Sequence, residues 1–399
     1  MTRFVPTSID ELRDAIGAAL AAEEPVELVA GGTKRGLGRP LQTPHVVDLT
    51  RLSGIRDYQP NELVLTAGAA TPLTAIDRAL NAAGQMLAFE PPDWRGLLGQ
   101  AHGSQTLGGI LACNLSGPRR IKAGAARDHF LGFSAVSGRA EAFKAGGKVV
   151  KNVTGYDLPK LMAGSYGTLA AMAEVTVKVL PRPETAGTVL LRGVAPDAAV
   201  GLMSAALGSP HEVSGAAYIP PTTPRASPLP AATGIVALRI EGPAPSVAFR
   251  RGALLAELGG DGAALGEAET AALWRDIANV TPLTGLGDRA VWRVSVAPSR
   301  GAELAQAVAR LIDAAWFLDW GGGLVWLAVI EPGDSGASVI REAIGGQGHA
   351  TLVRGSPGLR AAVPVFEPQP AALAALSRRV KEGFDPRHIL NPGRLVEGV

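Results

Sequence analysis

The sequence contains a single cysteine, Cys113, among its 399 residues. One thiol excludes an internal disulfide, a four-thiolate zinc site and a self-contained iron–sulfur cluster. The six histidines include no pair at metal-ligand spacing, so the sequence predicts no metal site. A chain without disulfides fits a reducing compartment, and we expect a cytoplasmic location.

The sequence also lacks a large net charge and long apolar runs. The formal net charge is only +2, which argues against nucleic acid as a partner. No run of 18 apolar residues occurs, and the first six residues lack the apolar core of a signal peptide. We therefore expect no direct membrane insertion, and any association with a membrane would come through partners. Apolar residues make up 47% and charged residues 19%, which predicts a globular protein long enough for two cores.

Glycine, in contrast, is abundant at 50 residues, and it clusters in segments 30–38 and 103–128. Glycine lets the backbone approach a bulky anion and adopt a positive φ, and consecutive N–H groups then form an anion-binding nest. Segment 103–128 also carries four cations, Arg119, Arg120, Lys122 and Arg127. The two segments are interpreted as two halves of a cradle for the pyrophosphate of a dinucleotide, although a solvated basic turn or a partner-docking surface would also explain the cations.

The first glycine segment does not fit a Rossmann fingerprint. Residues 26–30 alternate like a strand and run into Gly31 and Gly32, but Gly36, Gly38 and Pro40 follow at once. A helix is therefore not expected to open on these glycines, as the Rossmann fingerprint requires. Further strands are expected at 45–49 and 63–67.

Flanking signals predict the other elements of the first 180 residues. Ser8 and Glu11 form a capping-box pattern before an apolar helical stripe. Thr71 and Pro72 predict the N-cap and first residue of another helix. Residues 174–180 alternate strictly and predict a strand, and Pro181 and Pro183 mark a domain boundary.

The second half of the chain is expected to be α+β, with a proline-dense surface loop at 220–230. Strands are predicted near 187–193, 235–240, 291–296 and 324–330, and helices near 196–207, 246–258, 299–315 and 370–383. The last helix is expected to turn Leu373, Leu376, Val380 and Phe384 inward. Trp316, Phe317, Trp320 and Trp326 form an aromatic group that is more often core, but it is our first hypothesis for a partner surface because Trp is frequent at interface hot spots.

In their order along the chain, six short motifs resemble those of vanillyl-alcohol-oxidase-type flavoproteins, whose FAD-binding domain is called PCMH-type. They are residues 30–34 (AGGTK), 106–109 (TLGG), 127–128 (RD), 164–168 (GSYGT), 174–178 (EVTVK) and 389–393 (ILNPG). The resemblance implies an α+β fold with a PCMH-type FAD-binding domain of two α+β subdomains at 1–182. An α+β cap, or substrate-type, domain follows at 183–368, and a C-terminal helix and tail at 369–399 pack back on the FAD domain.

Within that group the chain is similar to the FAD-binding subunit of glycolate oxidase, the E-type subunit. The similarity rests on residues 151–161 (KNVTGYDLPKL), 319–323 (DWGGG) with Trp326, and 348–354 (GHATLVR). It implies oxidation of glycolate, a small 2-hydroxy acid, to glyoxylate in a complex with a larger flavin subunit and an iron–sulfur subunit. Two alternatives stay open: a self-sufficient FAD-dependent oxidase or dehydrogenase of another alcohol or hydroxy acid, and a non-catalytic assembly subunit.

The same resemblance implies a set of FAD-binding residues. They are Gly31, Gly32, Thr33, Lys34, Arg35, Gly36, Thr106, Gly108, Gly109, Asn114, Ser116, Gly117, Gly124, Arg127, Asp128, Glu174, Val175 and Asn391. Gly109 is expected to open a short helix that runs through Asn114. Lys34 stands where covalent members of the group carry the flavin-linking histidine, so FAD is expected to be bound non-covalently. Cys113 lies in an apolar helical turn and is interpreted as a small buried side chain.

The catalytic residues are less defined by the sequence. Oxidation of a 2-hydroxy acid needs a base for the hydroxyl proton and a cation for the carboxylate. His129 and His349 are candidate bases, and Arg354 is a candidate clamp that shares a face with His349 only if a bulge intervenes. Packed, hydrogen-bonded roles are equally open for both histidines.

Overall fold

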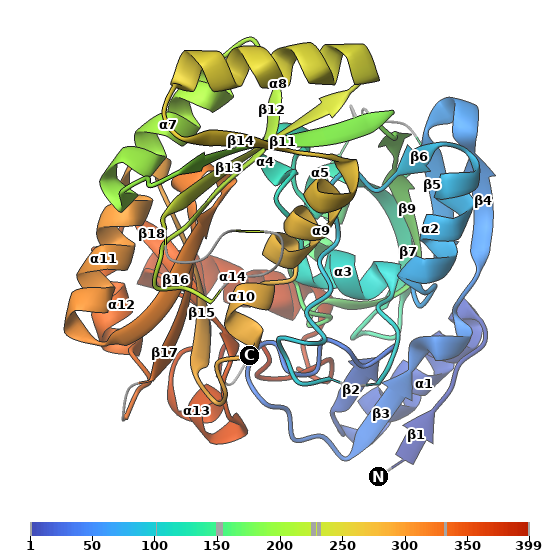
Figure 1. The fold of residues 1–399 in the computed structure, drawn as a ribbon. Helices are drawn as coiled ribbons and strands as arrows, with labels where there is room; N and C mark the ends of the chain where they lie inside the picture. The colour runs from blue at the N-terminus through green and yellow to red at the C-terminus, as the bar shows by residue number, and fades with distance from the viewer. Residues whose placement is uncertain are drawn as a thin grey trace.

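The computed structural model describes residues 2–100, 102–148, 155–224, 229, 233–330 and 333–397. The chain divides its strands between small sheets in the first half and one large sheet in the second (Figure 1). The predicted α+β class with PCMH-type architecture is confirmed by this arrangement and by the comparisons below. The proposed limits at 182/183 and 368/369 stay predictions.

A three-stranded parallel sheet opens the chain and positions the first glycine segment. Its strands run in the order β1 (Thr2–Phe4), β3 (His45–Asp48) and β2 (Val26–Val29), with α1 (Ile9–Ala22) and the 3₁₀ turn η1 (Leu49–Arg51). The N-cap of α1 is the predicted Ser8, whose hydroxyl accepts from the Glu11 amide at 3.1 Å. β2 runs into residues 30–38 without a helix, as expected, and the segment forms turns in which the Arg35 amide donates to the Gly32 carbonyl and the Leu37 amide to the Lys34 carbonyl.

A five-stranded antiparallel sheet follows, with β9 at its centre. Its order is β4 (Ile55–Gln59), β5 (Val64–Gly68), β9 (Ala170–Lys178), β7 (Phe130–Ser137) and β8 (Ala142–Gly146). The elements between these strands are η2 (Pro60–Glu62), α2 (Leu73–Ala82), β6 (Gln85–Met86), α3 (Leu107–Cys113), α4 (Arg120–Ala123), α5 (Ala126–His129) and α6 (Leu158–Met162), and β6 pairs with β10 (Leu180–Pro181). The helix predicted from Thr71 is α2, but Pro72 is its N-cap, because the Thr71 hydroxyl accepts from the Gly54 amide at 2.9 Å and donates to the Gly68 carbonyl at 2.6 Å.

The second half is built on one eight-stranded sheet. Its order is β14 (Gly262–Leu265), β11 (Thr185–Arg192), β13 (Ile235–Gly242), β12 (Val213–Ile219), β16 (Asp313–Asp319), β17 (Leu324–Ile330), β15 (Ala290–Val296) and β18 (Gly348–Arg354). Its outer face is covered by α7 (Pro196–Gly208), α8 (Ala244–Leu258), α11 (Gly301–Leu311) and α12 (Ala337–Ile344) (Figure 1). Its other face packs toward the first half, beside α9 (Glu267–Ala278) and α10 (Thr281–Thr284). The remaining elements are η3 (Pro298–Arg300), η4 (Trp320–Gly322), α13 (Pro357–Ala362) and α14 (Ala371–Phe384).

The helix predicted at 299–315 is wrong at its end. α11 stops at Leu311, and residues 313–319 form β16, because their side chains alternate between the two buried faces of the sheet.

The proposed partner surface is also wrong: Trp316, Phe317, Trp320 and Trp326 are all at most 5% exposed. Phe317, Trp320 and Trp326 belong to the core shared with the first half, where Trp326 packs edge-on against Trp94, whereas Trp316 lies in the core under the outer helices.

The C-terminal segment returns to the first half. The Val26 amide donates to the Ile389 carbonyl at 2.8 Å, and the Asn391 amide donates to the Val26 carbonyl at 3.0 Å. Within α14, however, the predicted inner face is half wrong. Val380 and Phe384 pack on the core, whereas Leu373 and Leu376 are each 48% exposed, because the first turns of the helix extend past the residues it packs against.

Candidate functional site

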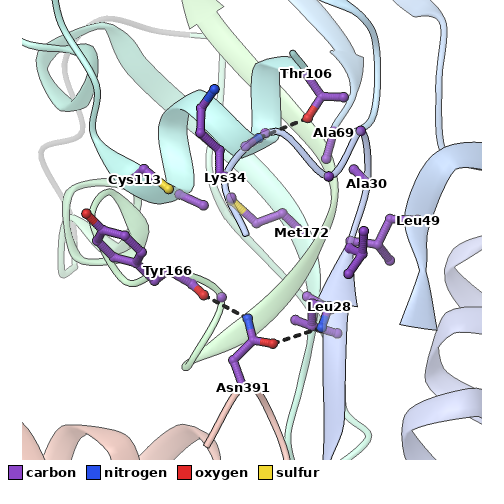
Figure 2. A pocket seen from close by; sticks show the side chains of 18 of the residues that line it. Leu28, Ala30, Lys34, Leu49, Ala69, Thr106, Cys113, Tyr166, Met172 and Asn391 are labelled. Atoms are coloured by element: carbon purple, nitrogen blue, oxygen red, sulfur yellow. Dashed lines mark hydrogen bonds between the residues drawn. The ribbon is translucent and has the colours of Figure 1, made fainter. Parts of the chain in front are cut away.

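An open cavity of about 110 Å³ lies where β2, α3, β9 and the C-terminal segment meet (Figure 2). Its walls come from segments far apart in the sequence, which the fold alone brings together. The lining residues are Leu28, Val29, Ala30, Gly31, Gly32, Thr33, Lys34, Arg35, Leu49, Ala69, Thr106, Gly108, Gly109, Ala112, Cys113, Tyr166, Gly167, Ala170, Ala171, Met172, Asn391 and Arg394. Nine of the sequence-predicted residues are among them: Gly31 to Arg35, Thr106, Gly108, Gly109 and Asn391.

The loop after β2 lines this cavity with backbone N–H groups. None of the N–H groups of residues 31–34 donates to an acceptor within the described part of the chain. Gly32 adopts φ +74°, and a Cβ at this position would meet no atom within 4 Å. A glycine in this conformation, followed by consecutive unpaired N–H groups, forms a nest for an anionic group.

The two glycine segments touch. A Cβ on Gly31 would lie 1.7 Å from the Ser104 carbonyl oxygen, and one on Gly103 would lie 2.2 Å from the Gly31 carbonyl oxygen. Only glycine permits this approach, because any side chain would overlap backbone that cannot move independently. The close contact holds the 31–34 loop over the N-terminus of α3.

Helix α3 begins one residue after Thr106 and ends at Cys113, with Asn114 as its C-cap, so the expected start at Gly109 is wrong by two residues. Thr106 caps the helix by accepting from the Gly109 amide at 3.2 Å, drawn dashed in Figure 2. Gly108 packs against Ala69, where a Cβ would meet the Ala69 Cβ at 2.7 Å. Gly109 has only the Thr106 hydroxyl near its Cβ position, so its open side faces the cavity.

Three titratable side chains shape the electrostatics of the cavity. Lys34 Nζ donates to Gln105 Oε1 at 2.5 Å, and burial lowers the pKa of Lys34 to about 8. Burial also raises the pKa of Cys113 to about 11, so its thiol is neutral at pH 7. The pKa of Tyr166 is raised, again chiefly by burial. At neutral pH these three side chains contribute one cation and two neutral polar groups, and the guanidinium groups of Arg35 and Arg394 add positive charge to the lining.

The C-terminal segment closes one end of the cavity through Asn391. Its side-chain oxygen accepts from the Leu28 amide, and its side-chain nitrogen donates to the Tyr166 carbonyl, each at 2.8 Å (Figure 2). Arg394 then donates to the Lys34 carbonyl at 3.0 Å. These contacts fix β2, the 31–34 loop and the Tyr166 turn relative to one another.

The other predicted cofactor residues do not line this cavity. Asn114, Ser116 and Asp128 accept from the amides of residues 127, 126 and 125 at 2.9–3.0 Å, so they cap α5. Arg127 is exposed beside them. Gly36 packs on Leu98, Gly117 on Glu90 and Gly124 on Asp128, while Glu174 and Val175 lie within β9, paired with β5 and β7.

The three catalytic candidates differ in their surroundings. His129 is buried, with Nε2 2.8 Å from the Ala123 carbonyl oxygen, and it packs against Phe89. Arg354 donates to the carbonyls of residues 289, 284 and 283, at 3.0 to 3.4 Å, so its guanidinium is already engaged; the anticipated bulge is present between Val291 and Trp292. His349 is exposed on β18, and partial burial together with Arg293 lowers its pKa, which leaves a neutral imidazole that can accept a proton.

Sequence reasoning missed Tyr166 and Arg394 as cavity residues, although both lie within or beside quoted motifs, at 164–168 and 389–393. Each lies in a turn beside a glycine, Gly167 or Gly393, but no local pattern marks the side chain as facing a cavity. In the motif at 151–161, residues 151–154 lie outside the described residues. Leu158 is the first residue of α6, and Asp157 is its N-cap. Within the described ranges no group of three His, Cys, Asp or Glu side chains is arranged to hold a metal ion.

A second cavity, of about 310 Å³, lies between the two halves, but charges in its lining neutralise one another. Arg239 binds Glu90 at 2.8 and 3.1 Å, and Arg119 binds Glu241 at 2.7 and 3.0 Å. Burial alone would raise the pKa of Glu241, but Arg239 and Arg119 outweigh it and lower the pKa to about 2. This group is a cross-link between the halves and not a cofactor cradle.

The cavity of Figure 2 fits the diphosphate of a dinucleotide, because unpaired N–H groups, an open glycine and a lysine converge there. A family profile described as FAD binding domain matches residues 3–146. p-Cresol methylhydroxylase with substrate bound shares the fold, with a TM-score of 0.71 over 99% of this chain and 88% of that chain, at 14% identity. The chain is therefore an FAD-binding flavoprotein of the PCMH type, in the class of FAD-linked oxidoreductases.

The full-length comparison narrows the assignment. Glycolate oxidase subunit GlcE of Escherichia coli (strain K12) is 33% identical over 385 residues, which cover 96% of each chain. Glycolate oxidase subunit GlcD of Bacillus subtilis (strain 168) is 30% identical over 190 residues, 47% of this chain and 38% of that protein. The chain belongs to the family of the glycolate oxidase subunit GlcE.

Among the described residues, no helix is long and apolar enough to cross a membrane.

Proposed function

We propose that the chain is the FAD-binding subunit of a glycolate oxidase complex and contributes to the oxidation of glycolate to glyoxylate. The observation that carries the flavin role is the run of four unpaired N–H groups at residues 31–34, facing the cavity above α3. Family membership over the whole chain supports the choice of glycolate. When bound, FAD supplies the two-electron acceptor that oxidation of a hydroxyl group requires.

The residues of the chain would hold FAD without a covalent bond. The 31–34 loop would bind the diphosphate through its N–H groups, and Lys34 would add a positive charge beside it. Lysine at position 34 supplies no imidazole for attachment, and burial keeps the Cys113 thiol neutral and unreactive. Acid precipitation of the purified protein should therefore leave all the flavin in the supernatant.

The proposal includes partners. A single cysteine cannot hold an iron–sulfur cluster, so electrons would pass to an iron–sulfur subunit and a larger flavin subunit of the same complex. The same reasoning from cysteine content supports a cytoplasmic site of action, with any membrane association through those partners.

Purification of the tagged chain from its host, under mild conditions, tests this proposal. We expect a flavin spectrum in the chain alone, and reduction of a dye by glycolate only when the partner subunits co-purify. Turnover of hydroxy acids by the chain alone would favour the self-sufficient enzyme. A colourless chain in a fully active complex would favour the assembly role, and either result would overturn the proposal.

A further inference from the structure

One guanidinium of the C-terminal segment is buried in the wall of the cofactor cavity. Arg394 lines the cavity, is only 7% exposed, and donates from Nη2 to the Lys34 carbonyl at 3.0 Å. It forms no ion pair within the described ranges. Glu27 is near enough to act on it, but both oxygens of that carboxylate are bound by Arg35. The Lys34 carbonyl, and not an acidic side chain, is therefore the group that Arg394 holds.

The backbone around Arg394 fixes the direction of its side chain. The Arg394 amide donates to the Asn391 carbonyl at 3.2 Å, and the Arg394 carbonyl accepts from the Arg39 amide at 2.9 Å. Its stem packs against Gly38, where a Cβ would lie 3.2 Å from Arg394 Cδ. Arg360, on α13, donates to the Gly38 carbonyl at 2.9 Å, so the second half of the chain also holds this contact. The guanidinium thus reaches Lys34 from a fixed base.

Two tight turns connect the Lys34 carbonyl to the unpaired N–H groups of the loop. The Lys34 carbonyl also accepts from the Leu37 amide at 3.0 Å, and the Gly32 carbonyl accepts from the Arg35 amide at 3.3 Å. In a trans peptide unit the C=O and N–H bonds point in opposite directions. The Lys34 carbonyl and the Arg35 amide belong to one such unit, and the Gly32 carbonyl and the Thr33 amide belong to another.

A series of hydrogen bonds therefore runs from the guanidinium toward the cavity. Arg394 fixes the 34/35 peptide unit, and the N–H group of that unit binds the carbonyl of the 32/33 unit. The Thr33 N–H group then points the opposite way, and it has no acceptor within the described part of the chain. Hydrogen bonds in series polarise one another, so a cation at one end strengthens the donor at the other. An anion is the acceptor that such a donor favours.

We propose that Arg394 is a positioning residue for the diphosphate of FAD, on which it acts through the 34/35 and 32/33 peptide units. This inference deepens the proposed function and rests on it for the identity of the cofactor. Arg394 lies 360 positions after the residue whose carbonyl it binds. Docking of the C-terminal segment is therefore a condition for tight binding of a diphosphate.

Calorimetry of the full-length protein, after removal of FAD, tests this role with ADP as the probe. Adenosine, which lacks the diphosphate, is the parallel titration. Arg394→Met keeps an unbranched stem but removes the donors and the charge, and it should weaken ADP binding about tenfold to a hundredfold. The affinity for adenosine should be the same as in the wild type. Arg394→Lys keeps the charge on a side chain that lacks the planar fork, and it should bind ADP at an intermediate level.

Arg39→Met is the matched control. It removes a nearby cation that does not line the cavity and whose Nη2 lies 3.3 Å from Glu397 Oε2. It also keeps the backbone amide that donates to the Arg394 carbonyl, so its ADP affinity should be unchanged. Equal losses of ADP binding in Arg39→Met and Arg394→Met would overturn the proposal. Wild-type affinity in Arg394→Lys would also overturn it, because charge alone would then explain the effect, as would equal losses of ADP and adenosine in Arg394→Met.

The positioning role and the flavin role fail in different ways. Wild-type protein that holds FAD, together with an Arg394→Met protein that keeps its ADP affinity, would refute the positioning role and leave the flavin role standing. Wild-type protein that holds FAD but does not bind ADP would have the same meaning. Protein without FAD that still binds ADP through Arg394 would support the positioning role and contradict the proposed function.

Discussion

Gly109 is the residue at which cofactor binding can be separated from folding. A Cβ at Gly108 would press into Ala69, so a side chain there would disturb α3 itself. A Cβ at Gly109 meets only the Thr106 hydroxyl at 3.0 Å and otherwise points to open space. A larger residue at 109 would therefore occupy the cavity while the helix persists.

We expect Gly109→Glu to abolish FAD retention, because its carboxylate would both fill the cavity and repel the diphosphate. The ratio of flavin to protein should fall below about one tenth of the wild-type value. Gly201→Glu introduces the same side chain on the exposed face of α7, where no atom lies within 4 Å of the Cβ position, and should keep its flavin. A fully yellow Gly109→Glu protein would show that the cofactor binds elsewhere.

Lys34 should make FAD affinity depend on pH. Burial lowers the pKa of Lys34 to about 8 in the empty cavity, and a bound diphosphate would raise it again. Affinity should thus be greatest below pH 8 and fall, by up to about tenfold per pH unit, as pH rises above it. Cys113, with a pKa of about 11, stays neutral throughout this window.

Fluorescence titration of the apoprotein with FAD from pH 7 to 9.5 measures this slope. Lys34→Met should bind more weakly at pH 7 and show a flat profile. A wild-type affinity that does not change across the range would mean that Lys34 does not face the diphosphate.

At the scale of elements, α14 is held by a buried ion pair at its last turn. Lys381 Nζ lies 2.6 Å from Asp385 Oδ2 and also donates to the carbonyls of Thr168 and Leu390. Asp385 in turn accepts from the amides of Ile389 and Leu390. The pair therefore positions the segment that delivers Asn391 to the cavity.

Lys381→Met should lower the free energy of unfolding by about 3–5 kcal/mol, since it leaves a buried carboxylate without its cation. Urea denaturation at pH 7 measures the change. Arg379→Met, which removes an exposed cation from the same helix, should change it by less than about 0.5 kcal/mol. Equal effects in the two variants would show that the pair contributes nothing specific.

Local signals explain which elements the sequence predicts. α1 follows from its cap and stripe, and the absence of a helix after β2 follows from Gly36, Gly38 and Pro40. The strands β12 and β16 were not predicted, because they lie in the middle of a sheet with both faces covered, and the edge strand β14 was not predicted, because its sequence GAAL has no β-branched or aromatic residue. β12, for example, is buried along its whole length and has no alternation to detect.

Local sequence patterns also predict part of the candidate site. Residues 31–35 and 106–109 are glycine-rich and contiguous, so composition reveals them. Tyr166 lines the cavity only because its turn packs against the C-terminal segment through Asn391, and no local pattern predicts that packing. Asn114, Ser116 and Asp128 are polar residues of the expected kind, but their oxygens accept from amides at the start of α5 and none of the three lines the cavity.

At the scale of the whole molecule, four charges join the two halves. Glu90 and Arg119 belong to the first half, and Arg239 and Glu241 lie on β13. The relative placement of the two halves depends on this network, because Arg119 binds Glu241 and Arg239 binds Glu90 across the interface.

Glu90→Gln tests that dependence. It removes the carboxylate that binds Arg239 and should lower the free energy of unfolding by about 2–4 kcal/mol, since a buried guanidinium loses its partner. Glu212→Gln is the control: Glu212 also faces a cation of the other half, Lys122, but its side chain is 67% exposed, so the loss should stay under about 1 kcal/mol. A Glu90→Gln protein as stable as Glu212→Gln would show that the ion-pair network does not stabilise the interface.

Acid should weaken the same interface. Arg239 and Arg119 lower the pKa of Glu241 from 4.5 to about 2 against the opposing effect of burial. A carboxyl group whose pKa is lower in the folded state contributes stability that is complete above pH 4.5 and is lost as pH falls toward 2. Denaturation at a series of pH values should show this decline in the wild type and a shallower one in Glu241→Gln, which has no proton to take up at that position. Parallel declines in the two proteins would mean that Glu241 is not stabilised by its arginines, and that the two halves are joined mainly by the packing of Trp94 on Trp326.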